Sequence, residues 1–91
     1  MLHIISNITP AILNRINPND AVIFLENAVL HLLKNNIYQE KLIALKQLYV
    51  LNEHIKERGL LKQEILEHVI IIDYARFVEL TIEHYPIHSW T

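Results

Sequence analysis

Two carboxylates next to predicted strands, Asp20 and Asp73, are the first residues that could do chemistry. At neighbouring strand ends they could act as an acid/base pair or bind Mg²⁺. However, Asp20 precedes its predicted strand and Asp73 follows its own, so a parallel sheet would place them at opposite ends. Asp73 is better explained as the N-cap of the next helix and Asp20 as a turn residue. The two carboxylates therefore predict no catalytic pair.

The sequence contains six histidines, which is many for 91 residues, so a metal site has to be considered. His84 and His88 are four residues apart, but Pro86 between them breaks the helix that would place both on one face. Glu64 and His68 have the same spacing, but His68 begins a predicted strand. The chain has no H-E-x-x-H motif or comparable ligand cluster. We therefore predict no metal site, and a metal-binding regulator is kept only as an alternative.

Cysteine is absent and glycine nearly so, and each absence excludes a class of chemistry. Without cysteine, the chain itself has no disulfide, no thiolate nucleophile and no cysteine-ligated metal. Its single glycine, Gly59, excludes the glycine-rich loops that hold phosphates in nucleotide-binding proteins. We predict no catalytic residue, no cofactor-binding residue and no cofactor.

His3 and Trp90 lie close to the two ends of the chain. His3 has apolar neighbours, so we expect a structural histidine whose ring is hydrogen-bonded. Trp90 is the second-last residue and belongs to a short predicted tail that begins at His88. It could pack as a plug that ties the chain end down, or it could anchor a subunit interface. The sequence leaves both roles open.

The elements that would position these residues are clearest between His68 and His84. Val69–Ile72 is uniformly apolar, which predicts a short inner strand buried on both faces. After Asp73 the period changes to that of an amphipathic helix. The apolar side of this helix consists of Tyr74, Phe77, Val78, Thr81 and Tyr85.

The rest of the chain alternates strand and helix in the same way. Further strands are predicted at 2–5, 21–25 and 48–51, and helices at Thr9–Pro10 onward, 28–34 and 53–58, the last ended by Gly59 and preceded by Asn52 as a cap. Such alternation indicates an α/β fold. We expect one domain over residues 1–91 with a mostly parallel sheet of about four to five strands and helices on both faces.

The composition suggests a partner. Hydrophobic residues make up 52% of the chain, more than a core of this size can hide. The predicted helix at 28–34 is apolar nearly all round, so one of its sides would have to be covered by another subunit. The candidate interface residues are Val29, Leu30, Leu33, Tyr74, Phe77 and Trp90.

Charge and hydropathy exclude two kinds of partner. The net charge is −2 and the basic residues are scattered, so direct nucleic-acid binding is not expected. No apolar run approaches the length of a membrane span, and no signal peptide is visible. We expect a cytoplasmic protein that does not bind membranes.

Three parts of the chain together resemble the TusB/DsrH family of sulfur-relay proteins. The parts are the N-terminal stretch 1–5, the middle segments 20–29, 49–53 and 57–60, and the C-terminal stretch 71–81 with His84 and the Ser89-Trp90 pair. The resemblance covers nearly the whole chain and includes no catalytic motif. Asn27 stands where many relatives have glycine. The fold it implies is that of the DsrE/DsrF/DsrH-like proteins.

The resemblance also implies partners and a role. Members of the family assemble with TusC-like and TusD-like subunits into a heterohexamer, a dimer of heterotrimers. The complex takes persulfide sulfur from TusA and passes it through TusE to the 2-thio group of the wobble uridine in tRNA. The carrier cysteine belongs to the TusD-like subunit, and related DsrH subunits of sulfur oxidisers can have one of their own.

Because a persulfide carrier needs a thiol, this chain cannot carry sulfur itself. We expect a non-catalytic structural subunit of a TusBCD-like sulfurtransferase complex. Whether the relay serves tRNA thiolation or sulfur oxidation stays open, although the lack of cysteine favours tRNA. The alternative is a stand-alone homo-oligomeric α/β enzyme that uses carboxylate or histidine chemistry.

Overall fold

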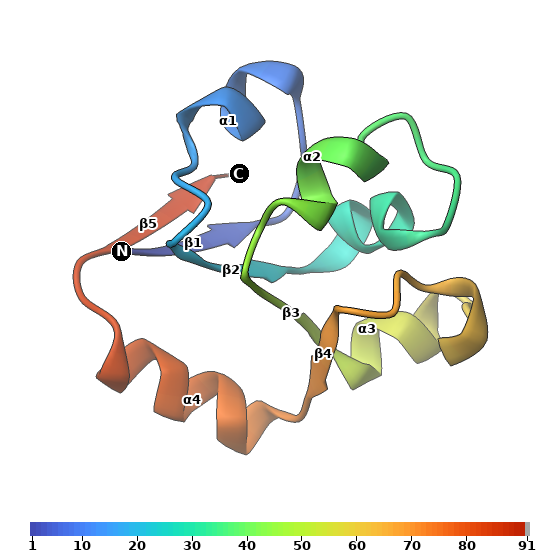
Figure 1. Cartoon of the computed structure of the whole chain (residues 1–91). Helices are drawn as coiled ribbons and strands as arrows, with labels where there is room; N and C mark the ends of the chain where they lie inside the picture. The colour runs from blue at the N-terminus through green and yellow to red at the C-terminus, as the bar shows by residue number, and fades with distance from the viewer. Residues whose placement is uncertain (91) are drawn as a thin grey trace.

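The computed structural model describes residues 1–90, which form an α/β domain with five strands (Figure 1). The elements in chain order are β1 (Leu2–Ile5), α1 (Pro10–Arg15), β2 (Ala21–Phe24), the 3-10 helix η1 (Glu26–Leu32), α2 (Gln39–Ile43), β3 (Gln47–Leu51), α3 (Asn52–Glu57), the 3-10 helix η2 (Lys62–Glu64), β4 (Ile70–Ile72), α4 (Tyr74–Glu83) and β5 (Ile87–Trp90). The alternation predicted from the sequence is confirmed. Within residues 1–90, no helix has the length and apolarity needed to cross a membrane.

The five strands form one sheet in the order β4-β3-β2-β1-β5, and all neighbouring strands are parallel. The chain builds the sheet outward from β1 to β4 and then returns through α4 to add β5 on the other side of β1. The predicted parallel sheet is therefore confirmed. Its connections place α1, η1 and α2 on one face and α4 on the other (Figure 1).

The C-terminal residues form a strand where the sequence predicted a tail. Residues Ile87–Trp90 include no apolar run, so they have little strand signal of their own. They become β5 because β1 offers a free edge of backbone hydrogen-bonding groups. The Leu2 N–H donates to the carbonyl of Pro86 at 3.0 Å, and the Ser6 N–H donates to that of Trp90 at 3.1 Å.

The strand β4 is an edge strand, so the prediction of a strand buried on both faces was wrong. Ile72 is buried, but Ile71 is only partly covered and Ile70 is 46% exposed. The uniform apolar run signalled a strand correctly. It could not show that β4 has a neighbour, β3, on one side only.

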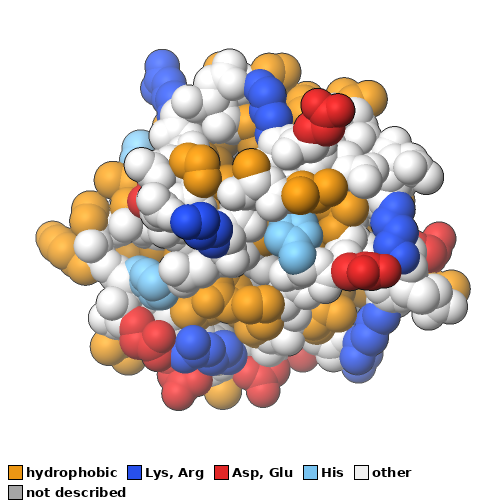
Figure 2. Space-filling model, viewed as in Figure 1, with side chains coloured by type: hydrophobic (Ala, Val, Ile, Leu, Met, Phe, Trp, Pro, Cys, Tyr) orange, Lys and Arg blue, Asp and Glu red, His pale blue; other side chains and the backbone are white. Residues whose placement is uncertain are grey.

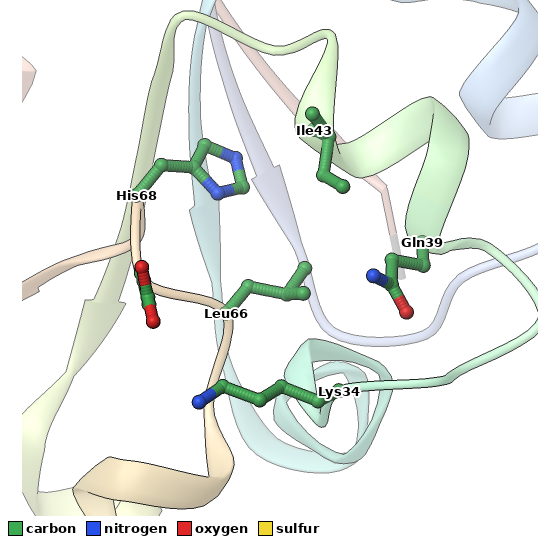
Figure 3. A pocket seen from close by; sticks show the side chains of 6 residues that line it. Lys34, Gln39, Ile43, Leu66 and His68 are labelled. Atoms are coloured by element: carbon green, nitrogen blue, oxygen red, sulfur yellow. The ribbon is translucent and has the colours of Figure 1, made fainter.

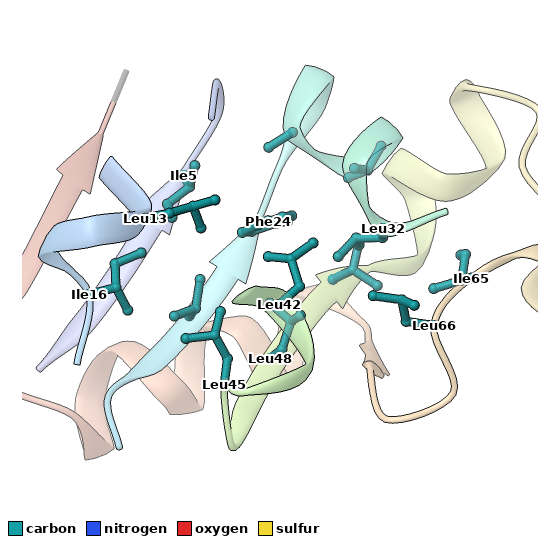
Figure 4. Close-up of a cluster of buried hydrophobic side chains, with 14 of the residues drawn as sticks. Ile5, Leu13, Ile16, Phe24, Leu32, Leu42, Leu45, Leu48, Ile65 and Leu66 are labelled. Carbon is teal, nitrogen blue, oxygen red and sulfur yellow. The ribbon is translucent and has the colours of Figure 1, made fainter. Parts of the chain in front are cut away.

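The larger of two hydrophobic cores lies on the face covered by α1, η1, α2 and α3 (Figure 4). Its buried members are Ile5, Leu13, Ile16, Val22, Phe24, Ala28, Val29, Leu32, Leu42, Leu45, Leu48, Val50, Ile55, Ile65 and Leu66. The smaller core on the other face consists of Leu2, Ala21, Ile23, Tyr49, Leu51, Ile72 and Leu80. Among the described residues, its helical contribution comes from α4 alone, through Leu80 and the partly buried Phe77. One face of the sheet is thus covered much more thickly than the other.

The segment after β2 differs from the predicted helix at 28–34. It forms the 3-10 helix η1, which begins two residues earlier at Glu26. A 3-10 helix has three residues per turn, so Val29 and Leu32 lie on the same side, and both are fully buried. Leu30 points elsewhere and is 42% exposed. Because the turn follows β2 directly, it packs most of its apolar side chains into the core of this chain.

The predicted helix ends were correct in most cases. Thr9 caps α1, where its side-chain oxygen accepts from the Ile12 N–H at 3.3 Å and Pro10 takes the first helical position. Gly59, after α3, has φ +67°, the left-handed conformation that glycine adopts without strain. Asn52 is an exception, because it is the first residue of α3 and makes no capping hydrogen bond.

Asp73 caps α4, which is the helix that covers the second face. Its Oδ1 accepts from the Arg76 N–H at 2.9 Å. We expect Asp73→Ala to lower the free energy of unfolding by about 1 kcal/mol, because the cap bond is lost. Asp73→Asn keeps an acceptor oxygen and should lose much less. Urea denaturation followed by circular dichroism measures both, and equal losses would contradict a capping role.

Candidate functional site

The two predicted carboxylates lie at opposite ends of the sheet, as expected. Asp20 immediately precedes β2, and Asp73 immediately follows β4. All strands run in the same direction, so these positions mark the amino end and the carboxyl end respectively. Asp20 and Asp73 therefore cannot act on one substrate group together.

Asp20 instead belongs to a hydrogen-bonded chain that joins three parts of the sequence. His3 is 2% exposed, and its Nε2 lies 2.9 Å from Oδ2 of Asp20. The indole Nε1 of Trp90 donates to Nδ1 of His3 at 3.0 Å. Because an indole N–H can only donate, Nδ1 must be the accepting nitrogen, so Nε2 carries the hydrogen and donates to Asp20. His3 is therefore the hydrogen-bonded structural histidine that the sequence predicted.

The charge of Asp20 is stabilised by its neighbours. Burial raises the pKa of this carboxyl, but the hydrogen bond from His3, the charge of the N-terminal ammonium and a backbone hydrogen bond at Asn17 lower it by more. The ammonium of Met1 lies 3.5 Å from Oδ1 of Asp20. The net result is a pKa below the ordinary value of 3.8. A lowered carboxyl pKa suits an ionised structural anchor and does not suit a general base at neutral pH.

Trp90 is held through contacts of its ring as well as through its nitrogen. The ring of His88 stacks on it with 4.0 Å between centroids, and the guanidinium carbon of Arg15 lies 6.0 Å from its centroid. The indole is partly buried against the larger core. These contacts give Trp90 the role of a plug that fastens β5 to the rest of the chain.

A hollow of about 440 Å³ lies between the loop after η1, the helix α2 and the segment before β4 (Figure 3). Its lining consists of Lys34, Gln39, Ile43, Leu66, Glu67 and His68. The polar groups do not converge on one point, since Nε2 of His68 is engaged by the carbonyl of Leu42 at 2.9 Å and Oε1 of Gln39 accepts from the Asn35 N–H. The hollow therefore has no arrangement of nucleophile, base and orienting group.

Metal-binding groups are scattered in the same way. Across residues 1–90, no three histidine, aspartate or glutamate side chains gather where they could hold one ion.

The six candidate interface residues are in very different environments. Val29 is fully buried in the core of this chain, so it has no surface to offer a partner. Phe77 packs on the smaller core and Trp90 on the larger one, and both are partly buried. Leu33 is also partly buried, whereas Leu30 and Tyr74 are 42% and 53% exposed. Only the last two present most of a face to solvent.

The most exposed apolar side chains of α4 were missed as surface residues by the sequence pattern. Val78 is 54% exposed, Ile82 is 78% exposed, and Tyr85 just beyond the helix is 89% exposed. The residue that anchors α4 to the sheet is Leu80, which is fully buried. The apolar arc of α4 is thus wider than the sheet can cover. Figure 2 shows hydrophobic side chains at the surface among charged ones in the lower part of the view, where α4 lies in Figure 1.

The lowered pKa of Asp20 leads to a prediction for stability at acid pH. A carboxyl whose folded pKa is depressed stabilises the fold fully above its unfolded pKa of 3.8, and this contribution disappears as pH falls through the lower folded value. We expect the wild type to be more stable than Asp20→Asn by about 1 kcal/mol at neutral pH, and the difference to shrink in strong acid. Urea unfolding followed by Trp90 fluorescence measures both.

Glu40→Gln is the matched control for this experiment, because Glu40 is an exposed carboxylate on α2. It should change stability little at any pH. A difference between wild type and Asp20→Asn that stays constant down to strong acid would contradict the role of the charge.

Comparison with known proteins places this domain in a family. The model of the DsrH like protein family matches residues 5–86. Protein TusB of Buchnera aphidicola subsp. Baizongia pistaciae is 34% identical over 80 residues, which covers 87% of this chain and 83% of the relative. Protein TusB of Escherichia coli strain K12 is 36% identical over 81 residues, covering 88% and 84% respectively.

A solved structure confirms the fold on independent grounds. A protein of unknown function from Methanobacterium thermoautotrophicum superposes with a TM-score of 0.76 over 98% of this chain and 96% of its own, at 11% sequence identity. A likeness at such low identity establishes the shared fold alone. The family follows from the sequence matches: with its family model matched over most of its length and relatives named TusB above 30% identity, this chain belongs to the TusB/DsrH family.

Proposed function

We propose that this chain is a non-catalytic structural subunit of a TusBCD-like sulfurtransferase complex, in the sulfur relay for 2-thiolation of the tRNA wobble uridine. The observation that carries the proposal is the absence of cysteine in a member of a sulfur-relay family. The relatives that support it bear the name Protein TusB.

The chemistry of sulfur transfer explains why this absence matters. A relay moves sulfur as a persulfide, which forms and is passed on by attack of a thiolate on a sulfur–sulfur bond. This chain has no thiol, and its only other sulfur is the thioether of Met1, which forms no persulfide. The carrier cysteine would belong to the TusD-like subunit, which would receive sulfur from TusA and deliver it to TusE.

The arrangement of the polar side chains agrees with a structural role. His3 and Asp20 are hydrogen-bonded to each other, and His3 also accepts from Trp90. These bonds connect the two ends of the chain. The side chains of Val78 and Ile82 on α4, in contrast, are mostly exposed. Exposed apolar surface of this kind is typical of a subunit in an assembly.

The proposed partners are a TusC-like and a TusD-like subunit, in a cytoplasmic heterohexamer made of two heterotrimers. The net charge of −2 and the scattered basic residues give no reason for this chain to contact tRNA itself. Its part in the relay would be to build the particle and to shape the dock around the cysteine of its neighbour.

Co-expression tests this proposal. An affinity tag on this chain should capture the TusC-like and TusD-like proteins encoded by the same organism, and native mass spectrometry should give a particle with two copies of each. A chain that purifies alone from cells containing both partners would contradict it, and would favour the stand-alone enzyme instead.

Sulfur labelling separates the structural role from a catalytic one. When the captured particle is loaded with ³⁵S-persulfide from a TusA-like donor, the label should lie on the TusD-like subunit only. Replacing the carrier cysteine of that subunit by serine should abolish labelling and leave the particle assembled. Label that stays on this chain would overturn the assignment.

A further inference from the structure

The strand β5 lies at one edge of the sheet, beside β1, and buries little of its own surface (Figure 1). Ile87, His88 and Ser89 are exposed, and Trp90 is only partly buried. The backbone of β5 pairs with β1 along its whole length. Strands with few buried side chains open locally at a lower free energy than core strands do. The attachment of β5 is therefore sensitive to the loss of a single side-chain contact.

One such contact joins Trp90 to His3, and it requires an unprotonated nitrogen. The indole Nε1–H of Trp90 donates to Nδ1 of His3 at 3.0 Å, while Nε2 of the same ring donates to Asp20 at 2.9 Å. An imidazolium carries a hydrogen on both nitrogens and has no acceptor. After protonation, the N–H at Nδ1 would face the indole N–H, and two donors cannot bond to each other. His3 can therefore take up a proton only with the loss of its hydrogen bond to Trp90.

Asp20 gives the protonated ring a stable place in the folded domain. Burial raises the pKa of its carboxyl, but the bond from His3 and the ammonium of Met1 keep that pKa below 3.8, so Asp20 stays ionised in weak acid. His3 is almost fully buried, and a charge in such a place needs an opposite charge. A charge-assisted bond between imidazolium and carboxylate supplies it. The domain can thus stay folded around either form of His3.

Two further basic groups lie in the same ring cluster. On α1, the guanidinium carbon of Arg15 lies 6.0 Å from the ring centroid of Trp90. On β5, the ring centroid of His88 lies 6.3 Å from that of His3. On the other side of β1, the residue paired with His3 is the uncharged Val22. Because His88 belongs to β5, release of this strand also separates the two histidines when both are charged.

We infer that protonation of His3 releases Trp90 and detaches β5 from β1, so that the sheet reversibly loses its fifth strand in weak acid. Histidine is the side chain that ordinarily titrates between about pH 5 and 8. Neutral His3 holds the strand and protonated His3 does not, so β5 is attached at higher pH and is lost as pH falls. Its release leaves the backbone N–H and C=O groups along one side of β1 unpaired. This change lies within the chain and needs no partner subunit, so it does not depend on the proposed function.

Hydrogen exchange measured by NMR between about pH 7.5 and 5 tests the release. The Ser6 N–H donates to the carbonyl of Trp90 at 3.1 Å, across β1 and β5, whereas the Leu25 N–H donates to that of Ile5 at 2.8 Å, next to β1 and β2. Release of β5 exposes the first amide and not the second. Because opening takes up one proton, the opening constant at Ser6 should rise by up to about tenfold per pH unit. The protection factor of Leu25 should stay constant.

Two variants remove the pH dependence in different ways. His3→Asn places an amide oxygen near the position of Nδ1 and cannot titrate, so Ser6 should stay protected throughout this pH range. Trp90→Phe keeps an aromatic ring but loses the N–H donor. In that variant Ser6 should exchange faster already at neutral pH, with no further acceleration in acid. Circular dichroism of each variant establishes that it is folded.

His88→Phe is the matched control, because it keeps a ring on β5 next to the indole but cannot be protonated. The pH dependence at Ser6 should remain. Constant protection of Ser6 over this pH range would overturn the inference, and so would an equal loss at Ser6 and Leu25, which reports unfolding of the whole domain. A pH dependence that survives in His3→Asn, or that disappears in His88→Phe, would assign the proton to another group and would overturn it as well.

Discussion

A parallel sheet has two apolar faces, and both must be kept from water, yet this chain has enough helix to cover only one of them well. The larger core takes side chains from α1, η1, α2 and α3, whereas the smaller one receives Leu80 and Phe77 from α4 alone. The ten residues of α4 must therefore cross the whole second face on the way from β4 to β5. This unequal cover explains the exposed apolar side chains of α4 and links the fold to assembly.

The hydrogen-bonded chain of Asp20, His3 and Trp90 connects β5, at one edge of the sheet, to β1 and to the start of β2. The hydrogen bond from Trp90 to His3 adds to the backbone hydrogen bonds that hold residues Ile87–Trp90 on β1. The row of indole, imidazole and carboxylate resembles the base and orienting group of a hydrolase. It lacks a nucleophile, because an indole N–H occupies the position where one would stand. Its polar groups hold the strands in place and have no catalytic arrangement.

A structural role in an assembly depends on the side chains that this chain leaves exposed. A relay subunit without a thiol can contribute only surfaces, and this chain leaves large apolar side chains exposed on several elements, among them Val78 and Ile82 on α4. Val29 is the opposite case. The sequence predicted an interface residue, but the 3-10 helix η1 places its side chain in the core of this chain. In a domain this small, the same residue types serve the core and the interface, and only position separates them.

The sequence by itself determined the α/β class, the positions of strands β1 to β4 along the chain, the caps at Thr9 and Asp73, the left-handed Gly59 and the inability to carry sulfur, because each depends on local propensity or on the presence of an atom. The order of the strands in the sheet was not among them. Tertiary structure alone decided that β4 lies at an edge, that the last residues form β5, that His3 bonds to both Asp20 and Trp90, and that Val78 and Ile82 face water. These outcomes depend on contacts between residues far apart in the chain: the hydrogen bond between Trp90 and His3 joins positions separated by 87 residues. No local pattern contains that information, because it arises only when the sheet brings both ends of the chain together.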